Sequence, residues 1–176
     1  MAFVVRLACR GDEEGIADTI RSVYDEFGFT WEAEGYHADL YDIQAHYLDL
    51  GHAFWVAEAE GEIVGTTALE LFDPIAGHLG ARVWMGSNFR IGGTDCALQR
   101  LYVRSKVRNS GIGTRLFLET LGAAREAGRT AMEIWSDKRF VDAHRLYSKH
   151  GAELVGDRIC SDPDQAPEWG LVLRLA

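Results

Sequence analysis

The stretch from Gln99 to Leu118 carries five cationic side chains and no acidic one, in a chain whose formal charge is −9. Within it, Arg108-Asn-Ser-Gly-Ile-Gly113 places two closely spaced glycines beside a cation. The first turn of a helix leaves main-chain N–H groups without acceptors, its dipole favours an anion, and glycine lets a ligand oxygen approach the backbone. The stretch therefore predicts a phosphate-binding turn. The alternative is a solvated basic loop whose glycines only form the turn.

The spacing of the glycines narrows the class of phosphate ligand. An ATP-type loop requires Gly-x-x-x-x-Gly-Lys-Ser/Thr, which is absent. A dinucleotide turn requires Gly-x-Gly-x-x-Gly, and Leu116 stands where the third glycine would allow close packing of the helix. Glu133 follows where an acid would hold a ribose, so a Rossmann-type dinucleotide-binding protein remains the lesser alternative.

Composition excludes several other classes of protein. With 18 Lys and Arg against 27 Asp and Glu, the chain lacks the broadly basic face of a nucleic-acid-binding protein. Arg6 interrupts the apolar N-terminal stretch, which argues against a secretory signal, and no apolar run approaches the ~20 residues of a membrane span. We therefore expect a cytoplasmic protein with no nucleic-acid or membrane partner. Cys9, Cys96 and Cys160 lack CxxC spacing, which predicts buried free thiols and neither a disulfide framework nor a metal site.

Apolar periodicity predicts the elements that position the turn. A strand at 96–103, a helix at 111–126 and a strand at 132–135 make a βαβ unit whose strands should be parallel. The helix predicted at 141–149 ends before Gly151, as glycine favours.

The rest of the chain supplies further strands and helices. The remaining predicted elements are a strand at 3–7, a helix beginning in the segment 11–14, a second helix around residues 40–50, a hairpin of strands 54–57 and 63–69 turning at Glu60-Gly61, a small hairpin about Gly86-Ser87-Asn88 within the irregular stretch 73–94, and strands at 152–157 and 169–175. Together they predict one α/β (α+β) domain over residues 1–176, with a mixed central sheet of about six to seven strands flanked by about four helices.

Two motifs resemble a known family. Arg100-Leu-Tyr-Val103 followed by Arg108-Asn-Ser-Gly-Ile-Gly113, and later Ala143-His-Arg-Leu-Tyr-Ser-Lys-His-Gly151, are similar to segments of the GNAT superfamily of acyl-CoA-dependent N-acetyltransferases. The first matches the family's Arg/Gln-x-x-Gly-x-Gly/Ala pyrophosphate loop, and the last matches its Leu-Tyr-x-x-x-Gly segment. The predicted order of elements is also that of the GNAT fold, so the resemblance spans the chain.

The resemblance implies acetyl-CoA as the acyl donor and assigns residues to it. The main chain of the 101–103 strand would run alongside the pantetheine arm, and the loop would cradle the pyrophosphate. Phe140 occupies the position where many members have an asparagine that bonds the cofactor. The hydroxyl of Tyr147 would face the thioester sulfur. The implied cofactor-binding residues are Leu101, Tyr102, Val103, Arg108, Asn109, Ser110, Gly111, Ile112, Gly113, Thr114 and Phe140.

Acetyl transfer to a primary amine requires an acceptor for the amine's proton, because a lysine-like amine has a pKa of ~10.4 and is mostly charged at pH 7. Ala97 occupies a strand position that is a glutamate base in several members, so this chain needs another group. Glu70 and Asp73, near the end of a predicted strand, are the leading candidates. Asp95 is a further candidate, and His144 a weaker one.

The acceptor is a small-molecule or peptide amine that the sequence does not identify. The acidic and aromatic segment 32–39, with Asp42, would border the acceptor site in this fold and favour a cationic amine; a solvated surface loop is the alternative. Homodimers are frequent in the family, and the sequence carries no direct sign of one. Because alanine replaces the glutamate base at position 97, an alternative is a degenerate acyl-CoA-binding or sensor module that no longer transfers the acyl group.

Overall fold

The computed structural model describes residues 2–175 and contains a mixed seven-stranded sheet with four helices. The strand order is β1-β2-β3-β6-β7-β9-β8, and β4 pairs with β5 in a separate hairpin. This confirms the predicted fold class. The helices are α1 (Glu13–Phe27), α2 (Ile43–His46), α3 (Ile112–Glu126) and α4 (Val141–Lys149). The strands are β1 (Val4–Leu7), β2 (Ala53–Ala59), β3 (Glu62–Leu71), β4 (Arg82–Met85), β5 (Asn88–Ile91), β6 (Cys96–Val103), β7 (Ala131–Asp137), β8 (Glu153–Ile159) and β9 (Pro167–Arg174).

The chain divides into two compact units. Unit 1 comprises the residues up to Glu70 together with Gln99–Leu121. Unit 2 comprises Leu71–Leu98 and the residues from Gly122 onward. A single domain over the whole chain stays a prediction.

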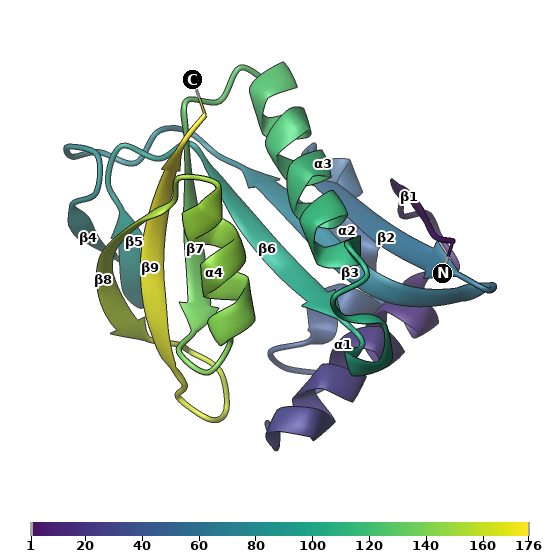
Figure 1. The fold of residues 1–176 in the computed structure, drawn as a ribbon. Coiled ribbons are helices and arrows are strands. Elements are labelled where there is room, and N and C mark those ends of the chain that lie inside the picture. The colour runs from purple at the N-terminus through teal and green to yellow at the C-terminus, as the bar shows by residue number, and fades with distance from the viewer. Residues whose placement is uncertain (1, 176) are drawn as a thin grey trace. The chain divides into compact units, whose positions relative to one another are not determined.

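In unit 1, β1, β2 and β3 form an antiparallel meander with helices on both faces. Figure 1 shows α3 in front of β3, with α1 and α2 behind the strands. The β2–β3 hairpin turns at Glu60 (φ 54°) and Gly61 (φ 80°), two successive left-handed residues that suit a tight hairpin turn. The hairpin confirms the prediction from Glu60-Gly61.

The helix predicted around residues 40–50 is wrong as a continuous element. The structure has three short pieces instead: a 3₁₀ turn at Ala38–Tyr41, the four-residue α2, and a 3₁₀ turn at Leu48–Leu50. Asp42 (φ −150°) interrupts the helix because its carboxylate accepts the N–H of Ala45. The apolar spacing was nevertheless informative, since Leu40, Ile43 and Tyr47 are all buried.

In unit 2, β9 pairs antiparallel with both β7 and β8, and the Cys96–Leu98 part of β6 pairs parallel with β7. The parallel pairing confirms the predicted βαβ unit. Figure 1 shows α4 in front of β7 and β9 and the hairpin β4–β5 on the other side. That hairpin turns at Gly86 and Ser87, as the sequence predicted.

Two of the three cysteines follow the prediction. Cys96 and Cys160 are buried free thiols, whereas Cys9 is exposed, so the prediction for Cys9 is wrong. Cys9 lies in the turn between β1 and α1, where its N–H donates to the carboxylate of Asp12 at 2.8 Å. The backbone of Cys9 is therefore fixed by the turn while its side chain is left at the surface.

Candidate functional site

The loop between β6 and α3 in unit 1 has the backbone that an anion site needs. A 3₁₀ turn at Ser105–Val107 leads to Asn109 (φ 62°) and Gly111 (φ 90°), and α3 begins one residue later. The N–H of Arg115 donates to the carbonyl of Gly111 at 2.9 Å, which closes the first α-helical turn. The amides at 111–114 precede that bond and have no acceptor within the helix. A Cβ built on Gly111 meets no atom within 4 Å, so the space beside this backbone is open.

Close packing between α3 and β3 fixes where these amides lie. A Cβ on Gly65 of β3 would come within 2.9 Å of Leu116 Cδ1 and 3.0 Å of Ile112 Cγ2. Only glycine at this position lets the first two turns of α3 approach the strand so closely. No local sequence pattern marks Gly65, because the helix that requires a glycine there lies far along the chain.

Arg108 holds the loop against α1. Its Nε donates to the carbonyl of Val103 at 3.0 Å, and its two terminal nitrogens donate to the carboxylate of Glu26 at 2.7 and 2.6 Å. Ser110 Oγ donates to the carbonyl of Val107 at 2.5 Å and tightens the turn. The guanidinium is thus engaged by protein groups, and the loop offers an anion mainly its main-chain amides.

Three of the five cationic side chains in the predicted stretch form ion pairs in the structure. Besides Arg108, Arg100 pairs with Asp39 and Arg115 pairs with Glu119. Arg104 donates from Nε to the carbonyl of Ile63 at 3.1 Å. These acids offset part of the local charge, so an anion bound at this loop would be recognised mainly by oriented N–H dipoles.

The candidate bases have different surroundings. Glu70, half-buried at the end of β3, accepts a hydrogen bond from Gln99 Nε2 at 3.3 Å within unit 1. Asp73 is exposed in the bend after β3. Asp95 is buried, and its carboxylate accepts from both Thr130 N–H and Oγ1 and from Ala131 N–H, which fastens the start of β7. Asp95 therefore has a structural role that leaves it poorly placed to take a proton from an acceptor.

The residues predicted near the sulfur lie on α4 in unit 2. The side chain of Tyr147 is packed into the protein, with the residue only 3% exposed. Phe140 is the N-cap residue of α4 and makes no side-chain cap; an asparagine there would supply one. His144 Nε2 lies 3.1 Å from Ser136 Oγ, and burial lowers the pKa of His144. These contacts place His144 against β7 and support its reading as a packed residue.

Two carboxylates of the acidic segment predicted to border the acceptor site are bound by other groups of the protein. Asp39 binds Arg100 and also accepts the hydroxyl of Tyr47 at 2.5 Å, and Asp42 caps α2. Glu32 and Glu34 remain exposed. The prediction that the whole segment attracts a cationic amine is therefore weakened.

Arg100 is a feature that sequence reasoning missed. It lies within β6 but has φ 52°, a left-handed conformation that costs a non-glycine residue about 1–2 kcal/mol. Its guanidinium donates from Nε and Nη2 to the two carboxylate oxygens of Asp39, at 3.0 and 2.6 Å. No pattern in the sequence predicts either the backbone conformation or a partner 61 residues away.

Near this pair, His37 is fully buried and stacks on Trp31, with ring centroids 3.9 Å apart. The N–H of Glu32 donates to its Nδ1 at 3.1 Å, so a neutral ring carries its proton on Nε2. Burial lowers the pKa of His37 to about 4, and the nearby charge of Arg100 acts in the same direction. Protonation would place a second cation beside Arg100 inside the unit.

We expect acid to destabilise the fold through His37. Between pH 6.5 and 4 the unfolded state binds more protons than the folded state, so stability falls as the pH falls. The free energy of unfolding should drop by about 2 kcal/mol between pH 7 and pH 5 from this group alone. Urea unfolding at both pH values measures the drop, and His37→Asn should remove most of it. An unchanged pH dependence in the variant would assign the effect to other groups, such as His144.

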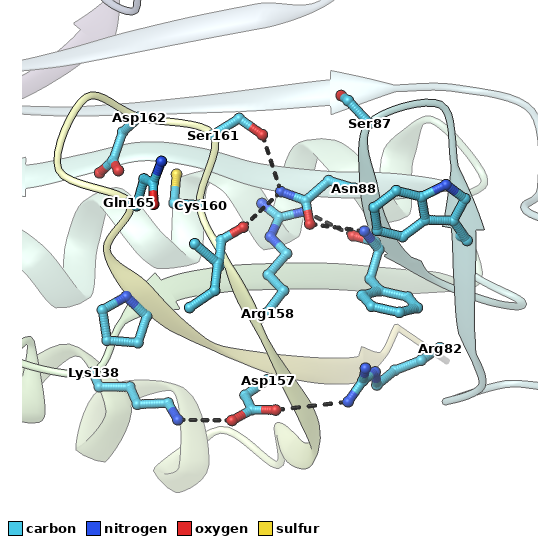
Figure 2. A pocket seen from close by; sticks show the side chains of 14 residues that line it. Arg82, Ser87, Asn88, Lys138, Asp157, Arg158, Cys160, Ser161, Asp162 and Gln165 are labelled. Carbon is cyan, nitrogen blue, oxygen red and sulfur yellow. Dashed lines mark hydrogen bonds and ion pairs between the residues drawn. The ribbon is translucent and has the colours of Figure 1, made fainter.

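Unit 2 also holds a pocket of about 770 Å³ beside the hairpin β4–β5 (Figure 2). Its cations are matched: Asp157 accepts from Lys138 Nζ at 2.8 Å and lies 3.6 Å from Arg82, and Arg158 donates to Glu168 at 2.7 Å. The cationic side chains that line this pocket are therefore engaged by carboxylates of the same unit. The lining residues are Arg82, Trp84, Ser87, Asn88, Phe89, Lys138, Asp157, Arg158, Ile159, Cys160, Ser161, Asp162, Gln165 and Pro167, none of which is a predicted site residue.

None of the helices within residues 2–175 combines the length and the apolar character that a membrane span requires. The same residues contain no group of three or more His, Cys, Asp or Glu side chains arranged to hold a metal ion.

Comparison with known proteins decides the family. Residues 18–152 match the model of the acetyltransferase (GNAT) family. This chain belongs to that family. The uncharacterized N-acetyltransferase YjgM of Escherichia coli is 31% identical over 155 residues, which cover 86% of this chain and 83% of that protein. N-acetyltransferase 8 of Rattus norvegicus is 34% identical over 123 residues, which cover 69% of this chain and 49% of that protein.

Solved structures of acetyltransferases share the fold. An acetyltransferase of the family from Staphylococcus aureus aligns with a TM-score of 0.75 at 22% identity, covering 99% of this chain and all of that one. The Salmonella typhimurium protein YncA, solved with its cofactor acetyl-CoA, aligns with a TM-score of 0.69 at 15% identity, covering 100% of this chain and 95% of that one. These alignments agree with the element order of a GNAT fold that the motifs implied.

Proposed function

We propose that this GNAT-family member transfers an acetyl group from acetyl-CoA to a primary amine of a small-molecule or peptide acceptor by direct attack. The observation that carries the proposal is the backbone of the 108–114 loop within a chain whose residues 18–152 match the family. Open space beside Gly111 and helix-terminal amides without intrahelical acceptors fit a diphosphate. The relatives' names support N-acetyl transfer, and YncA's bound acetyl-CoA supports the donor.

In this proposal the loop anchors the donor. The amides of the 108–114 loop hold the diphosphate, and Arg108 acts by fixing the loop to Glu26. The main chain of Leu101–Val103 borders the pantetheine arm, and one of its N–H groups stabilises the negative charge that develops on the carbonyl oxygen. Phe140 would offer the cofactor an aromatic ring at the position where the family resemblance implies an asparagine amide.

The transfer itself needs a base and a group that attends the sulfur. A carboxylate, Glu70 in preference to Asp73, removes the proton from the ammonium form of the acceptor, and Gln99 orients that carboxylate. The neutral nitrogen then attacks the thioester carbon and forms the new carbon–nitrogen bond. The carbon–sulfur bond breaks with its electron pair leaving on the sulfur, and the nitrogen releases its second proton to solvent water, which leaves a neutral amide. Tyr147 donates a hydrogen bond to the departing thiolate. Full proton transfer from a phenol of pKa ~10 to a thiolate whose acid has pKa ~8.5 would be uphill by about 2 kcal/mol.

Replacing Tyr147 by phenylalanine should lower kcat about tenfold and leave the Kd for acetyl-CoA within about twofold. The hydroxyl is proposed to act on charge that appears only as the sulfur departs, so its loss should not affect ground-state binding. Steady-state kinetics combined with calorimetry separate the two quantities. Equal losses in kcat and affinity would indicate that Tyr147 acts by packing, in keeping with its burial, and would contradict the proposed role.

The proposed activity is tested by following free thiol from acetyl-CoA in the presence of a panel of amines. The panel should include polyamines, amino acids, aminophosphonates and peptides with free N-termini or lysines. Thiol release that depends on an amine, with the acetylated amine detected by mass spectrometry, is the expected result. Acetyl-CoA binding without amine-dependent release would instead identify a binding or sensor module.

A further inference from the structure

The left-handed residue inside β6 is unusual for its location. Among residues 2–175, four non-glycine residues have positive φ: Glu60, Arg100, Asn109 and Gln165. Three of them lie in connections between elements, where such conformations are common. Arg100 alone lies within a strand, and it directly precedes the 101–103 segment.

Contacts from three segments of unit 1 hold Arg100 in this conformation. Thr66 Oγ1 on β3 donates to its carbonyl at 2.7 Å. Its guanidinium makes the two-bond ion pair with Asp39 and donates to the carbonyl of Tyr36 at 2.9 Å. The side chains of the pair are 11% and 19% exposed. Tyr47 satisfies a further lone pair of the carboxylate, so the ion pair is well hydrogen-bonded despite its burial.

General stability does not account for this arrangement. A buried ion pair is often no more stabilising than apolar residues of similar volume, and a left-handed arginine adds strain. Strained residues persist where their surroundings over-determine them, and they cluster at functional sites. The strain here falls on the residue whose conformation sets the direction of the next peptide group along β6.

We propose that Arg100 and Asp39 are positioning residues: their ion pair holds β6 in its left-handed kink and so directs the Leu101–Val103 main chain toward the acyl carbonyl. This inference rests on the proposed function, in which that main chain binds the donor. The hydrogen bonds described for the pair involve Tyr36, Tyr47 and Thr66, so donor affinity and donor activation should respond differently when the pair is broken. When the pair is broken, kcat should fall, whereas the affinity for acetyl-CoA should be retained because the loop at 108–114 still binds the diphosphate.

Comparison of Arg100→Gly with Arg100→Ala tests the inference. Both variants lose the guanidinium and its contacts, but only glycine adopts positive φ without steric cost. We expect kcat to fall three- to tenfold in Arg100→Gly and at least another tenfold in Arg100→Ala, with the Kd for acetyl-CoA within threefold of the wild type in both. Asp39→Asn, which keeps the arginine, should fall between the wild type and Arg100→Ala.

A spectroscopic readout makes the test independent of turnover. The carbonyl stretch of acetyl-CoA labelled with ¹³C at the acyl carbon should shift to lower wavenumber on binding the wild type, because a hydrogen bond polarises the carbonyl. The shift should persist in Arg100→Gly and be reduced in Arg100→Ala. An absence of amine-dependent thiol release in the wild type would refute the proposed function, whereas the carbonyl shift would still report on the kink.

Arg158→Ala is the matched control, since Arg158 and Glu168 form an ion pair of similar burial in unit 2, with side chains 16% and 11% exposed. Its kcat should stay within twofold of the wild type, even if its thermal midpoint falls. Equal kcat and equal carbonyl shifts in Arg100→Gly and Arg100→Ala would overturn the inference. Losses of kcat that follow the thermal midpoint across all variants, including Arg158→Ala, would overturn it as well.

Discussion

Gly111→Val should weaken acetyl-CoA binding at least about 100-fold, equivalent to about 2.7 kcal/mol, and leave the protein folded. At φ 90°, Gly111 has a backbone conformation that a β-branched residue strongly disfavours. The space around its Cβ position is open, so the effect comes from the backbone: the chain must rotate away, and the amides that follow lose their common direction. Calorimetric titration of acetyl-CoA into each protein measures the loss.

Gly122→Ala is the control for this substitution. Gly122 lies further along α3, has ordinary φ and also has open space around its Cβ position. Alanine in a helix interior should stabilise the protein by about 0.5–1 kcal/mol relative to glycine and leave the affinity for acetyl-CoA unchanged. If Gly111→Val bound acetyl-CoA as tightly as Gly122→Ala, the diphosphate would have to bind elsewhere.

Glu70→Gln should lower kcat at pH 7 by about 10²–10³-fold, within the usual contribution of a general base. Glutamine has nearly the same shape and can still accept the hydrogen bond from Gln99, so the fold should be preserved. The variant depends on acceptor that is already deprotonated. Its kcat/KM should therefore rise about tenfold per pH unit until the pH approaches the amine's own pKa, ~10.4 for a lysine-like acceptor.

Asp73→Asn serves as the comparison for the base. Asp73 is exposed, three residues after Glu70, and its loss should change kcat less than about threefold. A larger loss in Asp73→Asn than in Glu70→Gln would exchange the two roles. Unchanged rates in both variants would mean that neither carboxylate removes the proton.

Elements with a strong local signal were predictable from the sequence. Strand β6 at 96–103 and helix α4 at 141–149 have the predicted bounds, because apolar periodicity marks both elements and Gly151 follows the end of α4. The helix expected around residues 40–50 failed because the carboxylate of Asp42 competes for the backbone and ends one helical piece where another begins. The burial of Leu40 and Ile43 was predictable from their apolar spacing, but the path of the backbone was not.

The candidate site was predictable as far as its motifs reach. Gly111 lies in the expected turn, Gly113 lies in the first turn of α3, and Tyr147 lies on the expected helix. The partners of charged residues were not predictable, since Arg108 meets Glu26 and Arg100 meets Asp39 across large sequence separations. These pairs convert a stretch that looks strongly cationic in sequence into one whose anion-binding capacity resides mainly in the backbone.

In the proposed function, the loop at 108–114 anchors the donor through its diphosphate. Calorimetric comparison of acetyl-CoA with acetyl-pantetheine, which carries the same thioester but lacks the diphosphate and the nucleotide, tests it most directly. We predict micromolar affinity for acetyl-CoA and at least about 100-fold weaker binding of acetyl-pantetheine, a difference of about 2.7 kcal/mol. Equal affinities for the two, or no heat on mixing with acetyl-CoA, would contradict the account.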